Sequence, residues 1–205
     1  MGLLDSQGGE DYDCLQELSL CRSSGLESIL ARMKKVVDLT YSQEVQVMLG
    51  GGDMSTVRAG VLDKDSERAY RLGQCGALAL AISEQTGWPV YWLGRTWCCY
   101  DETCDEADYA DHPVVDQYGI SGFLCACQVE HIGVLHPDGS FIDIDGARTI
   151  ESAQADRESD VVAPASPLLL ADLQHGGRGW PQANMQAAHL FATSIIALLA
   201  QQRRG

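Results

Sequence analysis

The stretch HIGVLHPDGSFIDID, residues 131–145, decides the fold. Two runs with alternating apolar residues flank Pro137-Asp138-Gly139, a combination typical of a β-hairpin. A three-residue turn with Gly139 in the left-handed conformation gives one apolar and one polar face, whereas a two-residue turn mixes them. In the favoured register the apolar face holds Ile132, Val134, Ile142 and Ile144, and the polar face holds His131, Gly133, Asp143 and Asp145. The stretch therefore predicts two antiparallel strands with a histidine and two carboxylates on the same face.

The segment LGQCGALALAI, residues 72–82, predicts a buried helix that begins at Cys75 and ends at Gly87. Because it is apolar on nearly every side, we expect it in the centre of the domain. Unpaired backbone N–H groups at a helix start lower the pKa of a thiol, and the thiolate is the nucleophilic form of cysteine. Gly73 and Gly76 would let a substrate approach the sulfur. Cys75 is therefore the candidate nucleophile, and backbone N–H groups at this helix start would hold the oxyanion.

His131 is the candidate base that accepts the thiol proton. A carboxylate beside an imidazole orients the ring and stabilises its protonated form. The hairpin register offers Asp143 and Asp145 for this role, and Asp145 is closer in register but nearer the strand end. We favour Asp143, because Gly133 leaves space beside it, and keep Asp145 as the alternative. His136 is the rival base, but it lies at the turn on the other side of the strand, where we expect it to be exposed.

The remaining segments predict an α+β domain. Strands are expected at residues 44–49, 88–93, 122–129, 131–135 and 140–144, and helices at 24–37 and 181–202. The three glycines at 50–52 predict a loop, and the acidic residues 100–118 predict a long surface loop. We expect a single domain over 1–205, with an N-terminal extension at 1–20, a linker-like segment at 151–180 and a C-terminal helix at 181–202.

The order of Cys75 on a helix, then His131 and Asp143 on paired strands, resembles the papain-like fold superfamily. This superfamily includes papain-type peptidases, bacterial cell-wall peptidases, transglutaminases and arylamine N-acetyltransferases. The resemblance implies a central helix that carries the cysteine and packs on an antiparallel sheet. It also implies a Cys-His-Asp triad, acyl transfer on an amide, ester or thioester, and no cofactor. In papain the oxyanion glutamine lies several residues before the cysteine and a tryptophan follows it, whereas here Gln74 directly precedes Cys75 and Gly76 follows. Papain's glutamine therefore has no counterpart, and Gln74 or Gln128 is the substitute candidate.

The charge and the cysteines limit the other classes of function. The formal net charge of −15 disfavours nucleic acid and anionic membranes as partners. The apolar run 187–200 is too short to span a bilayer and no signal peptide is evident, so we expect a cytoplasmic protein. We expect the eight cysteines to be reduced thiols. A zinc site at Cys98, Cys99, Cys104, Cys125 and Cys127 is the alternative, but their spacings differ from paired C-x-x-C ligands, and we expect no metal.

The sequence therefore predicts a cysteine hydrolase, that is, a peptidase, amidase or deamidase acting on a protein or peptide through a thioester intermediate. An acyltransferase or transglutaminase with the same triad is the alternative, because the acceptor is not encoded in the triad. A non-catalytic acidic binding or effector protein and a zinc-binding module are further alternatives. The oligomeric state is left open.

Overall fold

The computed structural model describes residues 39–95, 108–113, 123–176, 180–202 and 204. The chain divides into two compact units, Met1–Asp38 and Leu39–Gly205, and every described residue belongs to the second. The expected extension at 1–20 and helix at 24–37 lie outside the described residues. So does most of the expected acidic loop at 100–118, within which β4 (Asp108–Pro113) is a strand paired with β5 (Phe123–Cys125).

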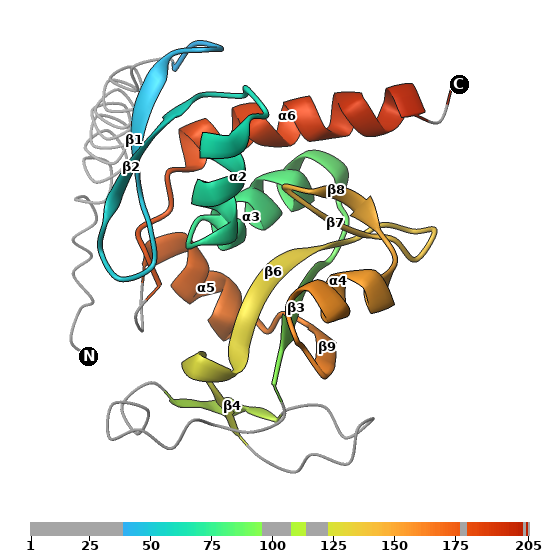
Figure 1. The fold of residues 1–205 in the computed structure, drawn as a ribbon. Helices are drawn as coiled ribbons and strands as arrows, with labels where there is room; N and C mark the ends of the chain where they lie inside the picture. Colours follow the sequence, from blue (N-terminus) through green and yellow to red (C-terminus); the bar gives the residue numbers. More distant parts are fainter. Residues whose placement is uncertain (1–38, 96–107, 114–122, 177–179, 203, 205) are drawn as a thin grey trace, which may run out of the picture. The chain divides into compact units, whose positions relative to one another are not determined.

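A five-stranded antiparallel sheet forms the centre of the second unit (Figure 1). Its order is β8 (Gly146–Arg148), β7 (Phe141–Asp143), β6 (Val129–Leu135), β3 (Val90–Gly94) and β9 (Val161–Pro164). The expected hairpin register is confirmed, since Val134 pairs with Ile142 and Leu135 with Phe141. Gly139 has φ +90°, and the N–H of His136 donates to the carbonyl of Ser140 across a three-residue turn.

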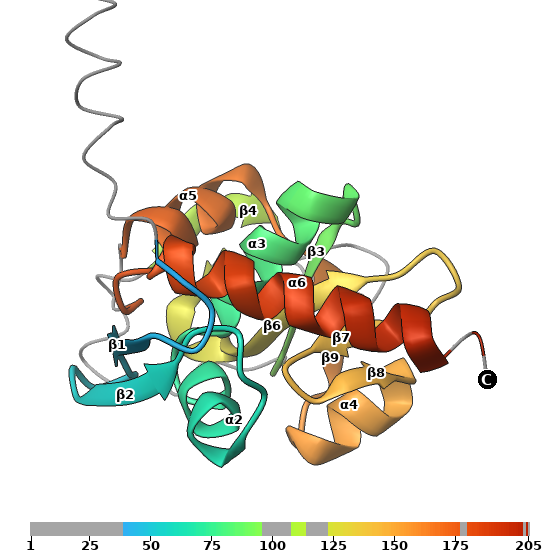
Figure 2. The same cartoon turned by 90° about the horizontal axis from the view of Figure 1, so that it is seen from above.

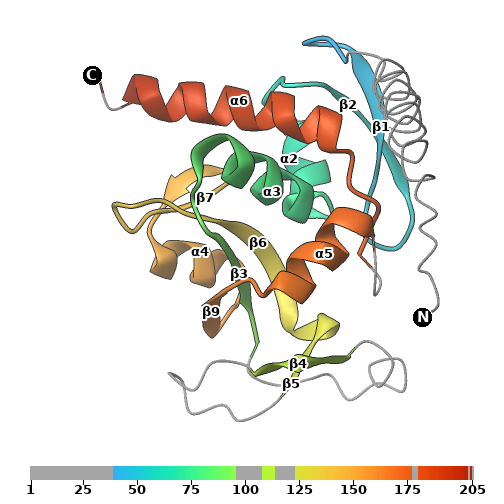
Figure 3. The ribbon, with the colours of Figure 1, turned by 180° about the vertical axis from the view of Figure 1, so that it is seen from behind.

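The helix that begins at Cys75, α3 (Cys75–Thr86), is buried along most of its length, as expected from its apolar sequence. It packs against β6 on one side and against α6 (Met185–Gln202) on the other. Figure 2 shows α6 running across α3, and Figure 3 shows α5 (Pro167–His175) beside the start of α3. Gly87 ends α3 in the left-handed conformation, at φ +75°. Gly76 is needed for packing, because a Cβ there would lie 2.6 Å from Leu173 of α5.

The two faces of the sheet have separate apolar clusters. The face toward α3 contributes Trp92, Ile132, Val134 and Ile142 to the main core. On the opposite face, Leu93 and Phe141 pack against Ala153 of α4 (Ile150–Asp156). The alternation that sequence analysis placed in residues 131–145 thus separates a core face from a face that carries His131 and Asp143.

Smaller elements extend the fold before α3. The hairpin of β1 (Glu44–Met48) and β2 (Met54–Arg58) turns through the three glycines at 50–52, which therefore form the expected loop. Strand β2 was not expected from sequence, and neither was α2 (Lys64–Arg71), whose capping box joins Asp63 and Ser66. The expected strand 122–129 is broken, because a 3-10 turn at Ala126–Gln128 separates β5 from β6. The C-terminal helix begins at Met185, where Asn184 accepts from the N–H of Ala187, rather than at 181.

The expected linker at 151–180 is wrong. The segment contains most of α4, then β9 at the edge of the sheet, and then α5. Thr149 and Ser166 cap the two helices through their side chains, and Val161 and Ala163 of β9 are buried. These three elements are short and partly polar, so the sequence shows too little hydrophobic periodicity to predict them. Among the described residues, no helix is both long and apolar enough to cross a membrane.

Candidate active site

The segment that leads into Cys75 is fixed by backbone contacts and by Gln74. A Cβ at Gly73 would lie 2.4 Å from the backbone nitrogen of Gly50, so only glycine fits there. The buried amide of Gln74 donates to the carbonyls of Met48 and Gln182, at 2.6 and 3.1 Å, and accepts from the N–H of Asn184. Both amide hydrogens of Gln74 are therefore occupied, and the side chain holds the start of α3 rather than offering a donor to an oxyanion.

The sulfur of Cys75 lies beside the part of β6 that extends past the end of β7. The N–H of Leu135 donates toward β3 and that of His136 toward the β7 side, so alternate N–H groups along β6 point to opposite neighbours. The N–H of Ile132 consequently points to the β7 side. Strand β7 ends at Asp143, which lies opposite Gly133, so no residue of β7 lies opposite Ile132. The backbone N–H groups of Ile132 and Gly76 instead donate hydrogen bonds to Cys75. Because β7 ends early, a backbone N–H of β6 is left to serve as a hydrogen-bond donor to the thiol.

His131 and Asp143 form a buried pair on the polar face of the hairpin. His131 Nε2 lies 2.9 Å from Asp143 Oδ2, and the two side chains are 0% and 1% exposed. Because an ionised carboxylate only accepts, Nε2 carries the proton. The room at Gly133 is filled by the ring of Phe141, since a Cβ there would lie 2.5 Å from Phe141 Cζ. Asp143 is therefore placed by the hairpin register and by its own partners, rather than by reaching across Gly133.

Cys75 faces the same imidazole, and it is 5% exposed. The thiol and the imidazole are coupled electrostatically, because each is among the causes of the other's pKa shift. Nδ1, the nitrogen not used by Asp143, makes no hydrogen bond of standard geometry among the described residues. Catalytic hydrogen bonds in free enzymes are often long and tighten when substrate binds. The three side chains are therefore brought together in the order thiol, imidazole, carboxylate.

The surroundings favour the charged forms of Cys75, His131 and Asp143. Burial would raise the pKa of Cys75, but His131 and the two backbone N–H groups outweigh it and lower the pKa. Burial would lower the pKa of His131, yet Asp143 and Cys75 raise it to about 9. The pKa of Asp143 is lowered, because the contacts to His131, Arg148 and the backbone N–H of Asp145 outweigh its burial. The arrangement therefore favours a thiolate and an imidazolium held by a carboxylate.

The other sequence candidates have partners of their own in the structure. Asp145 forms an ion pair with Arg71 of α2, at 2.7 Å, and no contact joins it to His131 among the described residues. Gln128 is buried, and its side chain donates to the carbonyl of Arg95. His136 is buried rather than exposed as expected, because its ring packs edge-on against Trp88, with centroids 4.4 Å apart.

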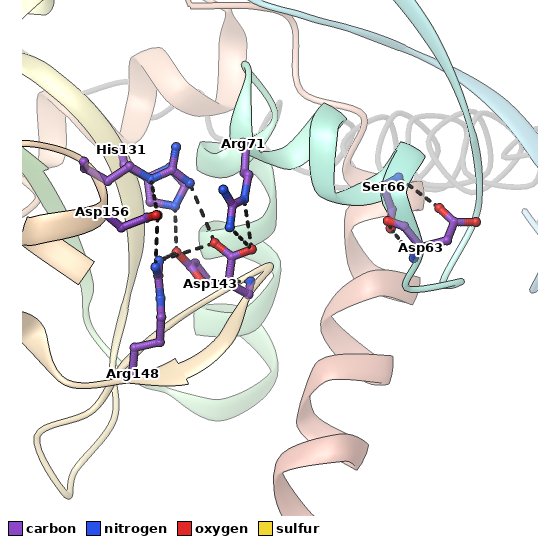
Figure 4. A network of polar contacts seen from close by, with 9 residues as sticks. Asp63, Ser66, Arg71, His131, Asp143, Arg148 and Asp156 are labelled. Carbon is purple, nitrogen blue, oxygen red and sulfur yellow. Dashed lines mark hydrogen bonds and ion pairs between the residues drawn. The ribbon is translucent and has the colours of Figure 1, made fainter. Parts of the chain in front are cut away.

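Sequence analysis missed Arg148, which contacts Asp143 directly (Figure 4). Asp145-Gly146 is a turn dipeptide, which indicates a turn and a further strand after β7. In the structure the two turn residues are Ile144 and Asp145, and Gly146 begins β8 in the left-handed conformation, at φ +89°. This register places Arg148 opposite Phe141, on the face of His131, whereas a turn centred on Asp145-Gly146 would place it opposite Asp143.

No protein-family model, curated protein or solved structure matches this chain. The functional inference below therefore rests on the residues of the site itself.

Within the described part of the chain, no group of histidine, cysteine or acidic side chains is arranged to hold a metal ion. Of the cysteines considered for zinc, Cys98, Cys99 and Cys104 lie outside the described residues, and Cys127 is a half-buried thiol. The described site brings together a thiol, an imidazole and a carboxylate, the groups that cysteine nucleophiles use.

Proposed function

We propose that this protein is a cysteine-dependent acyl-transfer hydrolase with a papain-like architecture, acting on an amide or ester of a peptide or protein. The observation that carries the proposal is the buried arrangement of Cys75, His131 and Asp143, with His131 Nε2 2.9 Å from Asp143 Oδ2. A helix that carries the cysteine and packs on an antiparallel sheet supports the superfamily assignment.

In this proposal the Cys75 thiolate attacks the carbonyl carbon of the substrate and forms a tetrahedral oxyanion. The backbone N–H groups that start α3 have no side-chain cap among the described residues and are the candidate donors for that oxyanion. His131 then donates its proton to the leaving amine or alcohol, and the C–N or C–O bond breaks to leave a thioester.

Hydrolysis completes the cycle. His131, now neutral, accepts a proton from water, and the hydroxide attacks the thioester carbonyl. The C–S bond breaks, the carboxylic acid leaves, and the thiolate–imidazolium pair is restored. If an amine replaces water in this step, the product is an amide and the protein is an acyltransferase. Asp143 remains ionised throughout, because His131 and Arg148 both face it.

The test is to trap the thioester. The protein is incubated with p-nitrophenyl acetate, quenched in acid, and analysed by intact mass and peptide mapping. We expect one acetyl group on Cys75, which is lost in Cys75→Ala and strongly reduced in His131→Ala. Acetylation that is spread over several cysteines, or that persists in Cys75→Ala, would contradict the proposal. Adding glycine methyl ester to the reaction separates hydrolysis from transfer: a transferase forms the amide faster in the wild type than in Cys75→Ala, which gives the uncatalysed background.

A further inference from the structure

Arg148 contacts the carboxylate oxygen that also serves His131. The turn between β7 and β8 pairs Arg148 with Phe141, which brings the guanidinium to the polar face of the hairpin. Its Nη2 donates to Asp143 Oδ2, the atom that accepts from His131 Nε2 (Figure 4). Asp143 Oδ1 accepts from the backbone N–H of Asp145 at 2.9 Å. Asp143 Oδ2 thus accepts hydrogen bonds from both His131 and Arg148, while Oδ1 is fixed by the backbone.

The guanidinium of Arg148 is itself held in place. Its Nη1 donates to Asp156 of α4 at 3.1 Å, and its side chain is only 16% exposed. Nη2 also lies 3.4 Å from Asp145 Oδ2. Because Arg148 is anchored on α4, it stays beside Asp143 whichever charge His131 carries.

We propose that Arg148 is a positioning residue that acts through Asp143, and that by sharing Oδ2 it limits how strongly the carboxylate holds the imidazolium of His131. This inference rests on the proposed function, since it concerns the proton that His131 must release. A carboxylate neutralised by one cation attracts a second one less. Without Arg148, the charge of Asp143 would act on His131 alone, and the imidazolium would resist deprotonation.

A weaker hold of Asp143 on the imidazolium would favour the proposed reaction. His131 must donate a proton when the thioester forms and accept one when it is hydrolysed, so its pKa has to stay near the working pH. The pKa of His131 is already raised to about 9 with Arg148 in place. A still higher value would leave too little neutral imidazole to activate water. Arg148 therefore favours the second half of the cycle.

The other charged groups around His131 come from several elements. Cys75 faces it from α3 and Asp143 from β7, while Arg148 lies on β8. The surrounding arginine–aspartate cluster, which contacts Asp143 or its partners, adds Arg71, Asp145, Asp156 and Arg157. Among these, Arg157 provides a matched control, because it contacts Asp145 and Asp156 but not Asp143.

The experiment compares Arg148→Gln, Arg148→Lys and Arg157→Gln with the wild type. The imidazole of His131 is titrated by NMR, with His131→Gln used to assign its signal. We expect Arg148→Gln to raise the pKa of His131 by about one unit, as removal of a nearby like charge does. Arg148→Lys should return the pKa toward the wild-type value, because the ammonium restores the charge. Arg157→Gln should leave it nearly unchanged.

Three results would overturn the inference: an unchanged pKa of His131 in Arg148→Gln, a lowered one, or an equal rise in Arg157→Gln. Circular dichroism of each variant shows whether it is folded, and if Arg148→Gln is not, Arg148→Met, which keeps an unbranched side chain without the charge, takes its place with the same expected rise. An unaltered pKa of His131 in a folded Arg148→Met would also overturn the inference. The titration needs no substrate, so its outcome is separate from that of the proposed function, which the trapping of a thioester on Cys75 tests.

Discussion

Replacing Asp143 with asparagine removes the charge that faces His131 and keeps the size of the side chain. The pKa of His131 is about 9, compared with its ordinary 6.5. Because one pKa unit corresponds to 1.36 kcal/mol, this net shift favours the imidazolium by about 3 kcal/mol, after the opposing effect of burial. Asp143 and Cys75 both contribute to it. Asp143→Asn should then lower the ratio of ion pair to neutral pair about tenfold.

The assay is the rate of Cys75 alkylation by iodoacetamide between pH 6 and 9, followed by intact mass and peptide mapping. At neutral pH, we expect the rate in Asp143→Asn to fall by up to about tenfold, because the thiolate fraction falls with the ion pair. Asp156→Asn is the control, since Asp156 also accepts from Arg148 but does not contact His131. An Asp143→Asn variant that is folded and alkylated at the wild-type rate, with the same pH dependence, would refute this reasoning.

Asp143→Asn should also change how the free energy of unfolding depends on pH. The lowered pKa of Asp143 means that its carboxylate stabilises the fold above its unfolded pKa of about 3.9, and that this is lost as pH falls through the folded value. The raised pKa of His131 means that its contribution is complete below about 6.5 and is lost as pH rises through about 9. The wild type should therefore exceed Asp143→Asn in free energy of unfolding between about pH 4 and pH 9, with the difference shrinking at both ends.

Three further exchanges test the surroundings. Gly133→Ala should lower the free energy of unfolding by about 1–3 kcal/mol, because the new Cβ would overlap the ring of Phe141; urea unfolding with no loss would contradict this contact. Gln74→Ala should cost about 2 kcal/mol, since buried backbone groups lose their partner; reduced thioester formation at unchanged stability would instead favour an oxyanion role. Asp145→Asn should cost below about 1 kcal/mol, because the side chain of its partner Arg71 is 40% exposed, and should leave the NMR titration of His131 in place; a fall in that pKa would restore Asp145 as the triad acid.

The hairpin that carries His131 and Asp143 was predictable because two independent signals agree. Pro137-Asp138-Gly139 requires a turn, and the alternation on either side is consistent with only one register. The start of α3 was predictable for a similar reason, since an apolar run begins at Cys75 and Gly87 ends it. Local sequence determines both features, so they could be inferred without knowledge of the rest of the fold.

The parts that could not be predicted depend on contacts between distant segments. Arg148 contacts Asp143 because β8 folds back beside β7 and α4 holds the guanidinium. The choice between Asp143 and Asp145 likewise depends on Arg71, which is far away in sequence and pairs with Asp145. Strand β9 joins the sheet through backbone pairing with β3, for which its four residues carry little local signal.

The most direct test of the central claim is the pH dependence of Cys75 alkylation in the wild type and in His131→Ala, with Cys127 as the internal comparison. If His131 activates the thiol, wild-type Cys75 should react well below the ordinary thiol pKa of about 8.5, because its pKa is lowered by the imidazolium. In His131→Ala the reactivity should move up to or above that value, while Cys127 reacts as before. Identical profiles for Cys75 in the two proteins, or slow and equal labelling of Cys75 and Cys127 in the wild type, would contradict the claim.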